Sequence, residues 1–253
     1  LFFVFAIILA IIFPQNFYER LNIQFRYENL KNNYNGRNYD ITNHEYIDKI
    51  ELGSKLGVFI TYGQSNSANF GEIGYKVKSG VFNFFNGTIF AYKDPVIGSD
   101  GFGGSVWGMV GDKLIENEIY DNVVFSNSGW GDTKLSELNN GNYLGYFLLN
   151  YRAAMNKFGK VDAILFHQGE SDYNSQDFDY YNEFNKLLIQ LKKYNINAPI
   201  FLSRASICGD NNKSNLELIN IQDKIINYFE LVYEGPNTDL LSEKKYRLQD
   251  NCH

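Results

Sequence analysis

Short apolar runs alternate with amphipathic stretches along the chain from Gly57 onward. Five of the runs are rich in β-branched or aromatic residues and are bounded by turn residues, which is typical of strands buried on both faces. These runs are residues 58–62, 122–126, 162–167, 199–204 and 231–234. Between them, apolar residues at spacings of three and four predict helices over residues 143–158, 178–194 and 215–229.

This alternation of strands and helices predicts an α/β fold. Right-handed crossovers give a three-layer, doubly wound and mostly parallel sheet of five strands, with helices on both faces. The 253 residues suit one large domain with a short appendage, and no internal repeat or compositional break interrupts residues 56–253. Ligands bind at the carboxyl ends of the strands in such sheets, so candidate chemistry should follow each apolar run.

The appendage lies at the N-terminal end. Residues 1–13 are an uncharged apolar run followed by Pro14. The run is shorter than the roughly 20 residues that span a bilayer and has the length of a signal-peptide core. We interpret residues 1–14 as an apolar helix that is a signal-peptide core or, preferably, an uncleaved membrane anchor, with a buried helix of the domain as the alternative. Either export interpretation places the protein in the periplasm or outside the cell.

Residues 15–55 are polar and rich in Asn and Tyr, without an apolar period. They predict a stalk or a loosely packed lead-in to the domain. His44 falls in this segment, and we expect it to be a solvated surface histidine.

Charge and rare residue types narrow the chemistry further. The chain has 23 Lys and Arg against 29 Asp and Glu, a net charge of −6. Binding to a polyphosphate backbone needs a basic footprint, so we expect no nucleic-acid partner. Two cysteines are too few for a zinc ribbon or a disulfide-built scaffold. No spacing of His, Cys and carboxylates is that of a metal site, so we predict no metal and no cofactor.

Four polar motifs follow the predicted strands. The first, GQSN at residues 63–66, places a serine at a strand-to-helix turn, where its hydroxyl can face the sheet edge or merely cap the helix. The second is the two-glycine loop NSGWGDT at residues 127–133, and the third is HQGESD at residues 167–172. The fourth is DNCH at residues 250–253, where one turn can bring Asp250 against one imidazole nitrogen and leave the other as a base.

Together these motifs resemble the sialate O-acetylesterase-like carbohydrate esterases of the SGNH hydrolase superfamily. The resemblance covers residues 57–253, includes GPNTDLL at residues 235–241, and implies an SGNH-hydrolase or flavodoxin-like fold. The family usually has Gly-Gly-Thr where this chain has Gly131-Asp132-Thr133. Its members continue past the histidine with a further helix, so we expect the domain of residues 56–253 to be truncated at its C-terminal end.

The resemblance implies a role for each matching residue. Ser65 is similar to the family's nucleophile, His253 to its general base and Asp250 to the carboxylate that orients the base. The oxyanion hole would consist of the backbone N–H groups of Ser65 and Gly131 and the side-chain amide of Gln168.

Further residues are expected to support this site. Those that flank the implied catalytic groups are Gln64, Asn66, Glu170 and Asp172, and His167 ends a buried strand and is interpreted as structural. Cys208 follows the fourth predicted strand and Cys252 adjoins His253, so both should lie at the same edge of the sheet. In an exported protein this favours a disulfide, with two separate thiols as the alternative.

The function that the resemblance implies is hydrolysis of O-acetyl groups on a carbohydrate, either sialic acid or a polysaccharide, through an acyl-enzyme on Ser65. The expected partner is an O-acetylated carbohydrate, and the expected contact with membrane is through the N-terminal segment only. An O-acetyltransferase that acts on a polysaccharide with the same triad is the first alternative. A non-catalytic glycan-binding module is the second, and it predicts that Ser65→Ala leaves function unchanged.

Overall fold

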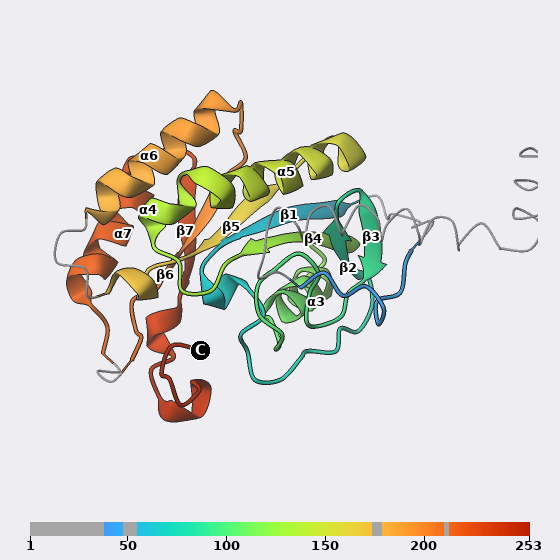
Figure 1. Cartoon of the computed structure of the whole chain (residues 1–253), viewed down its shortest axis with the longest axis horizontal. Helices are drawn as coiled ribbons and strands as arrows, with labels where there is room; N and C mark the ends of the chain where they lie inside the picture. The colour runs from blue at the N-terminus through green and yellow to red at the C-terminus, as the bar shows by residue number, and fades with distance from the viewer. Residues whose placement is uncertain (1–37, 48–54, 174–178, 210–212) are drawn as a thin grey trace, which may run out of the picture. The chain divides into compact units, whose positions relative to one another are not determined.

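The computed structural model describes residues 38–47, 55–173, 179–209 and 213–253. They belong to one compact unit that begins at Gly36. At its centre lies a seven-stranded sheet in the order β3-β2-β4-β1-β5-β6-β7 (Figure 1). Its strands are β1 (Leu56–Gly63), β2 (Val81–Phe85), β3 (Thr88–Ala91), β4 (Asn122–Gly129), β5 (Ala163–His167), β6 (Ile200–Arg204) and β7 (Val232–Asn237). Neighbouring strands pair in parallel except β2 and β3, which are antiparallel.

The sheet has seven strands where the sequence predicted five. The five predicted strands are present in the flavodoxin-like order β4-β1-β5-β6-β7. The other two strands, β2 and β3, form a hairpin beside β4. Asn86 and Gly87 join them with φ angles of 46° and 84°, the left-handed pair of a tight hairpin turn. An Asn-Gly pair between two apolar runs is a strong hairpin signal, and the sequence prediction overlooked it.

Helices cover both faces of the sheet (Figure 1). Three match the predicted helices: α5 (Gly141–Phe158), α6 (Tyr180–Lys193) and α7 (Leu216–Tyr228). On one face, the Phe147 ring of α5 lies 4.6 Å from that of Tyr62 in β1, and Phe184 of α6 lies 5.6 Å from Phe166 in β5. Apolar side chains at helical spacing therefore form this half of the core, as their periodicity predicted.

The opposite face is covered by α3 (Trp107–Glu116), which was not predicted. The Trp107 ring lies 5.9 Å from Phe125 in β4. Phe125 pairs in register with Phe59, so these two side chains lie on the same face of the sheet. Tyr62 lies three positions after Phe59 on β1, so Tyr62 and Phe125 point to opposite faces. A short helix, α4 (Leu135–Leu138), follows β4 and was also not predicted.

Residues 38–47 pack against β3 and the loop that follows it. Tyr46 forms an antiparallel bridge to Phe90 in β3, and the Asn38 N–H donates to the Ser99 carbonyl at 2.9 Å. His44 is 6% exposed and meets the Phe90 ring edge-on. The expectation of a solvated His44 is therefore wrong. Burial, assisted by the charge of Lys93, lowers the pKa of His44 to about 4.

The predicted apolar segment of residues 1–14 and most of the polar lead-in lie outside the described residues. Among the helices that the structure does describe, none combines the length and the apolar character that crossing a bilayer requires.

Candidate active site

The first polar motif forms a tight turn at the carboxyl end of β1. Gly63 has a φ of +135°, and a Cβ there would lie 1.9 Å from the His167 carbonyl oxygen, so only glycine fits. The Gln64 N–H donates to that same oxygen at 2.9 Å. The chain then enters the 3-10 turn η1 (Ser65–Ser67). Ser65 is 5% exposed and lines a cavity of about 790 Å³.

The fourth polar motif forms a turn that orients an imidazole. The Asp250 Oδ1 atom accepts the N–H groups of Cys252 and His253 at 2.9 and 3.1 Å. Its Oδ2 atom lies 2.5 Å from Nδ1 of His253. Burial raises the pKa of Asp250, but these hydrogen bonds outweigh it and hold the pKa below its ordinary value. A charged Asp250 fixes the tautomer with the proton on Nδ1 and the lone pair on Nε2.

The structure brings Ser65 and His253 to the same cavity. Nε2 of His253 is buried and has no hydrogen-bond partner among the described residues. Across those residues, no hydrogen bond joins Nε2 to the Ser65 hydroxyl. The three residues of the predicted triad therefore lie at the same edge of the sheet. The hydrogen bond between Asp250 and His253 is formed, and the one between His253 and Ser65 is not.

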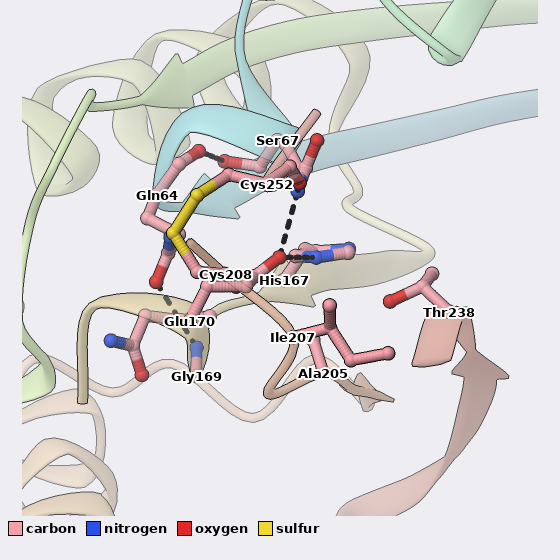
Figure 2. Close-up of polar contacts among 12 residues, drawn as sticks. Gln64, Ser67, His167, Gly169, Glu170, Ala205, Ile207, Cys208, Thr238 and Cys252 are labelled. Atoms are coloured by element: carbon pink, nitrogen blue, oxygen red, sulfur yellow. Dashed lines mark hydrogen bonds and ion pairs between the residues drawn. A yellow bond between two sulfur atoms is a disulfide. The ribbon is translucent and has the colours of Figure 1, made fainter. Parts of the chain in front are cut away.

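Several contacts hold the segment that carries His253. Its ring stacks on Phe70, with centroids 5.2 Å apart and an interplanar angle of 18°. A disulfide joins Cys208 to Cys252 (Figure 2). The Arg247 guanidinium donates to the carbonyl oxygens of Asn251 and Cys252 at 3.1 and 3.4 Å. Sequence analysis missed Phe70 and Arg247, because nothing in their local patterns distinguishes them from other core and surface residues.

The two other predicted oxyanion donors are bonded elsewhere in this structure. The Gly131 N–H donates to Oδ2 of Asp100 at 2.7 Å. Nε2 of Gln168 donates to the Thr133 carbonyl at 3.2 Å and to Asp172. Ser65 lines the cavity, and neither Gly131 nor Gln168 does. The Ser65 N–H, at the start of a 3-10 turn, takes part in no hydrogen bond found among the described residues.

The second motif departs from the family's usual Gly-Gly-Thr at Asp132, which has a φ of 48°. Asp tolerates this left-handed conformation better than most residues with a Cβ, so the loop keeps the backbone that glycine would adopt. The Thr133 hydroxyl donates to the carbonyl oxygens of Trp130 and Gly131 at 2.8 and 3.0 Å, which closes the loop.

Among the predicted supporting residues, Gln64 and Asp172 organise the loop after β5. Oε1 of Gln64 accepts the N–H group of Gly169 at 3.2 Å (Figure 2). The same oxygen accepts the Ser171 N–H at 3.0 Å. Asp172 accepts the Leu135 N–H at 3.0 Å. Burial raises the pKa of Asp172, although its hydrogen bonds oppose the shift. Both side chains therefore accept hydrogen bonds from backbone N–H groups, and Asp172 also accepts one from the Gln168 amide.

Asn66, His167 and Glu170 form a second polar cluster beside the cavity. Nε2 of His167 lies 2.7 Å from Oε1 of Glu170, toward which the ring points in Figure 2. The same oxygen accepts Nδ2 of Asn66 at 2.8 Å. Burial raises the pKa of Glu170, but the neighbouring His167 and Asn66 outweigh it and hold the pKa below its usual value. Glu170 is therefore a buried, charged carboxylate.

No group of three or more His, Cys, Asp or Glu side chains in the described part of the chain is arranged to hold a metal ion. The polar groups gathered at the sheet edge are a serine, two histidine–carboxylate pairs and amides. Such a set can perform nucleophilic and acid–base chemistry with its own side chains.

A flavodoxin-like sheet with a serine turn after its first strand and an Asp–His pair at the same edge is the arrangement that the resemblance to SGNH hydrolases implies. The chain belongs to the family described as "Carbohydrate esterase, sialic acid-specific acetylesterase", whose model matches residues 111–253. The match contains Asp250 and His253 but begins after Ser65. Family membership indicates an esterase that acts on carbohydrate.

A solved structure of low sequence identity shares the fold, and two others align with lower scores. A protein from Arabidopsis thaliana aligns with a TM-score of 0.56 at 15% identity, covering 72% of this chain and 85% of that one. A carbohydrate acetylesterase from Xanthomonas citri aligns at 0.48 and 12%, covering 72% and 50%. A lipase/acylhydrolase from Enterococcus faecalis aligns at 0.46 and 10%, covering 78% and 86%. No curated protein sequence matches the chain.

Proposed function

We propose that this protein is a serine esterase that removes O-acetyl groups from a carbohydrate, either sialic acid or a polysaccharide, through an acyl-enzyme on Ser65. The observation that carries the proposal is the unpartnered Nε2 of His253 at the cavity that Ser65 lines. Asp250 holds the other nitrogen of that ring, so the imidazole is prepared to accept a proton.

The reaction has two steps. In the first, Nε2 of His253 takes the proton of the Ser65 hydroxyl while Oγ bonds to the acetyl carbonyl carbon. The tetrahedral intermediate then expels the sugar oxygen, which receives the proton from His253 and leaves as an alcohol. In the second step, His253 deprotonates a water molecule, which attacks the acyl carbonyl carbon. The tetrahedral intermediate then expels Oγ of Ser65, which takes the proton back from His253, and the product leaves as acetic acid, which ionises to acetate. Asp250 stabilises the imidazolium that forms in each step.

The developing oxyanion needs hydrogen-bond donors. The Ser65 N–H is the one proposed donor without another partner in the described structure. Gly131 would first have to exchange its bond to Asp100 for one to the substrate, and Gln168 its bonds to Thr133 and Asp172. Their roles as donors therefore require a rearrangement of the two loops on substrate binding.

The proposal includes export from the cytoplasm. It is supported by the disulfide between Cys208 and Cys252, since disulfides persist mainly in oxidising compartments. An extracytoplasmic esterase would meet O-acetylated cell-surface or secreted carbohydrates directly.

The test measures acetate released from O-acetylated sialic acid and from an acetylated polysaccharide by the full chain. Ser65→Ala should reduce kcat by a factor on the order of 10⁴–10⁶, as loss of a nucleophile does. Ser67→Ala is the matched control, because the Ser67 hydroxyl lies in the same turn but donates to the Gln64 carbonyl at 2.8 Å. Equal activity of Ser65→Ala and wild type would refute the proposal. Transfer of the acetyl group to a hydroxyl of an added sugar acceptor, in place of acetate release, would favour the transferase.

A further inference from the structure

A buried charge links the proposed nucleophile turn to the segment that carries the proposed base. Glu170 is 4% exposed, and its Oε1 atom accepts Nδ2 of Asn66 and faces His167. Its Oε2 atom is buried and has no partner among the described residues. Removing a carboxylate from water is costly, and the contacts of Oε1 with Asn66 and His167 offset that cost, so the charge constrains the side chains around it.

Asn66 uses both hydrogens of its amide. One goes to Glu170 at 2.8 Å and the other to the Cys252 carbonyl oxygen at 2.7 Å. A reversed amide would place its oxygen against the Glu170 carboxylate, so the charge fixes which way the amide points. Asn66 directly follows Ser65 in the chain, and Cys252 directly precedes His253.

The Cys252 carbonyl belongs to the peptide unit whose nitrogen is that of His253. The oxygen end of this unit is held by Asn66, and its N–H end donates to Asp250 at 3.1 Å. Both polar ends of one peptide plane are therefore fixed, and the plane sets the direction in which the His253 side chain leaves the backbone.

Apart from the stacking of His253 on Phe70, the other restraints on this segment lead to different parts of the chain. The disulfide joins it to Cys208, and Asn251 donates to the Gly209 carbonyl at 3.2 Å, both in the loop after β6. Within the described ranges, one hydrogen bond connects η1 directly to residues 248–253, and it is the bond from Asn66 to the Cys252 carbonyl. It joins positions that are 186 residues apart in sequence.

We infer that Asn66, oriented by the buried Glu170, is a positioning residue that holds the His253 ring at the cavity beside Ser65, from where it can take the proton of the serine hydroxyl. Neither Asn66 nor Glu170 exchanges a proton with the substrate. The inference rests on the proposed function, because it assigns the device to the Ser65–His253 pair.

The test compares Asn66→Ala with a matched control, Asn139→Ala. Nδ2 of Asn139 also donates to a carboxylate, Glu183 at 2.6 Å, and to a backbone carbonyl, but between α4 and α6. Displacement of a catalytic group by about 1 Å can cost about 10²-fold in rate. We expect Asn66→Ala to lower kcat for an aryl acetate about 10–100-fold with little change in KM, and Asn139→Ala to keep wild-type kcat.

Two further readouts separate positioning from general destabilisation. Hydrogen exchange at residues 248–253 should accelerate in Asn66→Ala and stay unchanged in Asn139→Ala. Glu170→Gln keeps an oxygen acceptor but removes the charge that orients the amide, so its loss of kcat should be smaller, and the double variant should show less than the sum of the two effects.

Wild-type kcat and wild-type exchange in Asn66→Ala, in a protein whose wild type shows Ser65-dependent hydrolysis, would overturn the inference. So would equal losses of kcat in Asn66→Ala and Asn139→Ala. A wild type without Ser65-dependent hydrolysis would instead refute the proposed function, while accelerated exchange in Asn66→Ala would still support the link between the two segments.

Discussion

Removing the disulfide between Cys208 and Cys252 should destabilise the protein. The bond closes a loop across a sequence separation of 44 residues. For a loop of that length, the entropy removed from the unfolded chain corresponds to about 4 kcal/mol. The variant Cys208→Ser/Cys252→Ser should therefore lose about 2–4 kcal/mol in the free energy of unfolding, with the upper figure set by loop entropy.

The same variant should lose activity, because the disulfide ends one residue before His253. The last regular element before His253 is the 3-10 turn η4 (Lys244–Tyr246), so residues 248–253 are held by side-chain contacts and a few backbone hydrogen bonds, among them that from the Gly209 N–H to the Asp250 carbonyl at 3.2 Å. Without the disulfide, the hydrogen bonds from Asn66 and Arg247 remain. We expect kcat to fall about 10–100-fold, since small displacements of a catalytic group are costly.

Urea unfolding and aryl acetate kinetics measure the two effects. Wild type treated with dithiothreitol is the control, and it should approach the double variant in both measurements, while the variant itself should not respond to the reductant. A free energy of unfolding unchanged within about 0.5 kcal/mol, well below the expected loss, would refute the entropic argument. Wild-type kcat in the double variant would show that the disulfide does not position His253.

Three smaller predictions follow from other contacts. Gln168→Ala should cost about 1–3 kcal/mol in urea unfolding, because it strips the buried Asp172 carboxylate of its amide donor; unchanged stability would contradict this contact. Glu170 has a folded pKa below 4.5, so its charge stabilises the fold above that pH, and the contribution is lost as pH falls through the folded pKa. Wild type should thus lose stability more steeply than Glu170→Gln below pH 4.5, and parallel curves would refute the assignment. Phe70→Ala should lower kcat about 2–10-fold by removing the ring that stacks on His253; an unchanged kcat would show that the stacking does not orient the base.

Local pattern was sufficient to predict the central sheet and the place of the candidate site. The five apolar runs became five parallel strands, because residues buried on both faces leave a continuous apolar signal. Parallel strands end at one edge, so the motifs containing Ser65 and His253 could be expected to meet there. The hairpin of β2 and β3 was equally visible in its Asn86-Gly87 turn, and its omission was an error of interpretation.

Hydrogen-bond partners in the loops could not be predicted in the same way. The Gly131 N–H was expected to face the substrate, and it instead meets Asp100, 31 positions earlier. The bond between Asn66 and Glu170 joins positions 104 apart. Periodicity specifies which face a residue occupies, whereas the partner of a loop group depends on the three-dimensional course of both loops.

The most direct test of the central claim is mass-spectrometric mapping of a fluorophosphonate label on the full chain. If His253 activates Ser65 as a nucleophile, the label appears on Ser65, is absent from Ser65→Ala, and forms far more slowly on His253→Ala. Labelling of Ser65 at the same rate in wild type and His253→Ala would contradict the proposed base. A folded wild type in which Ser65 remains unlabelled would contradict the proposed nucleophile itself.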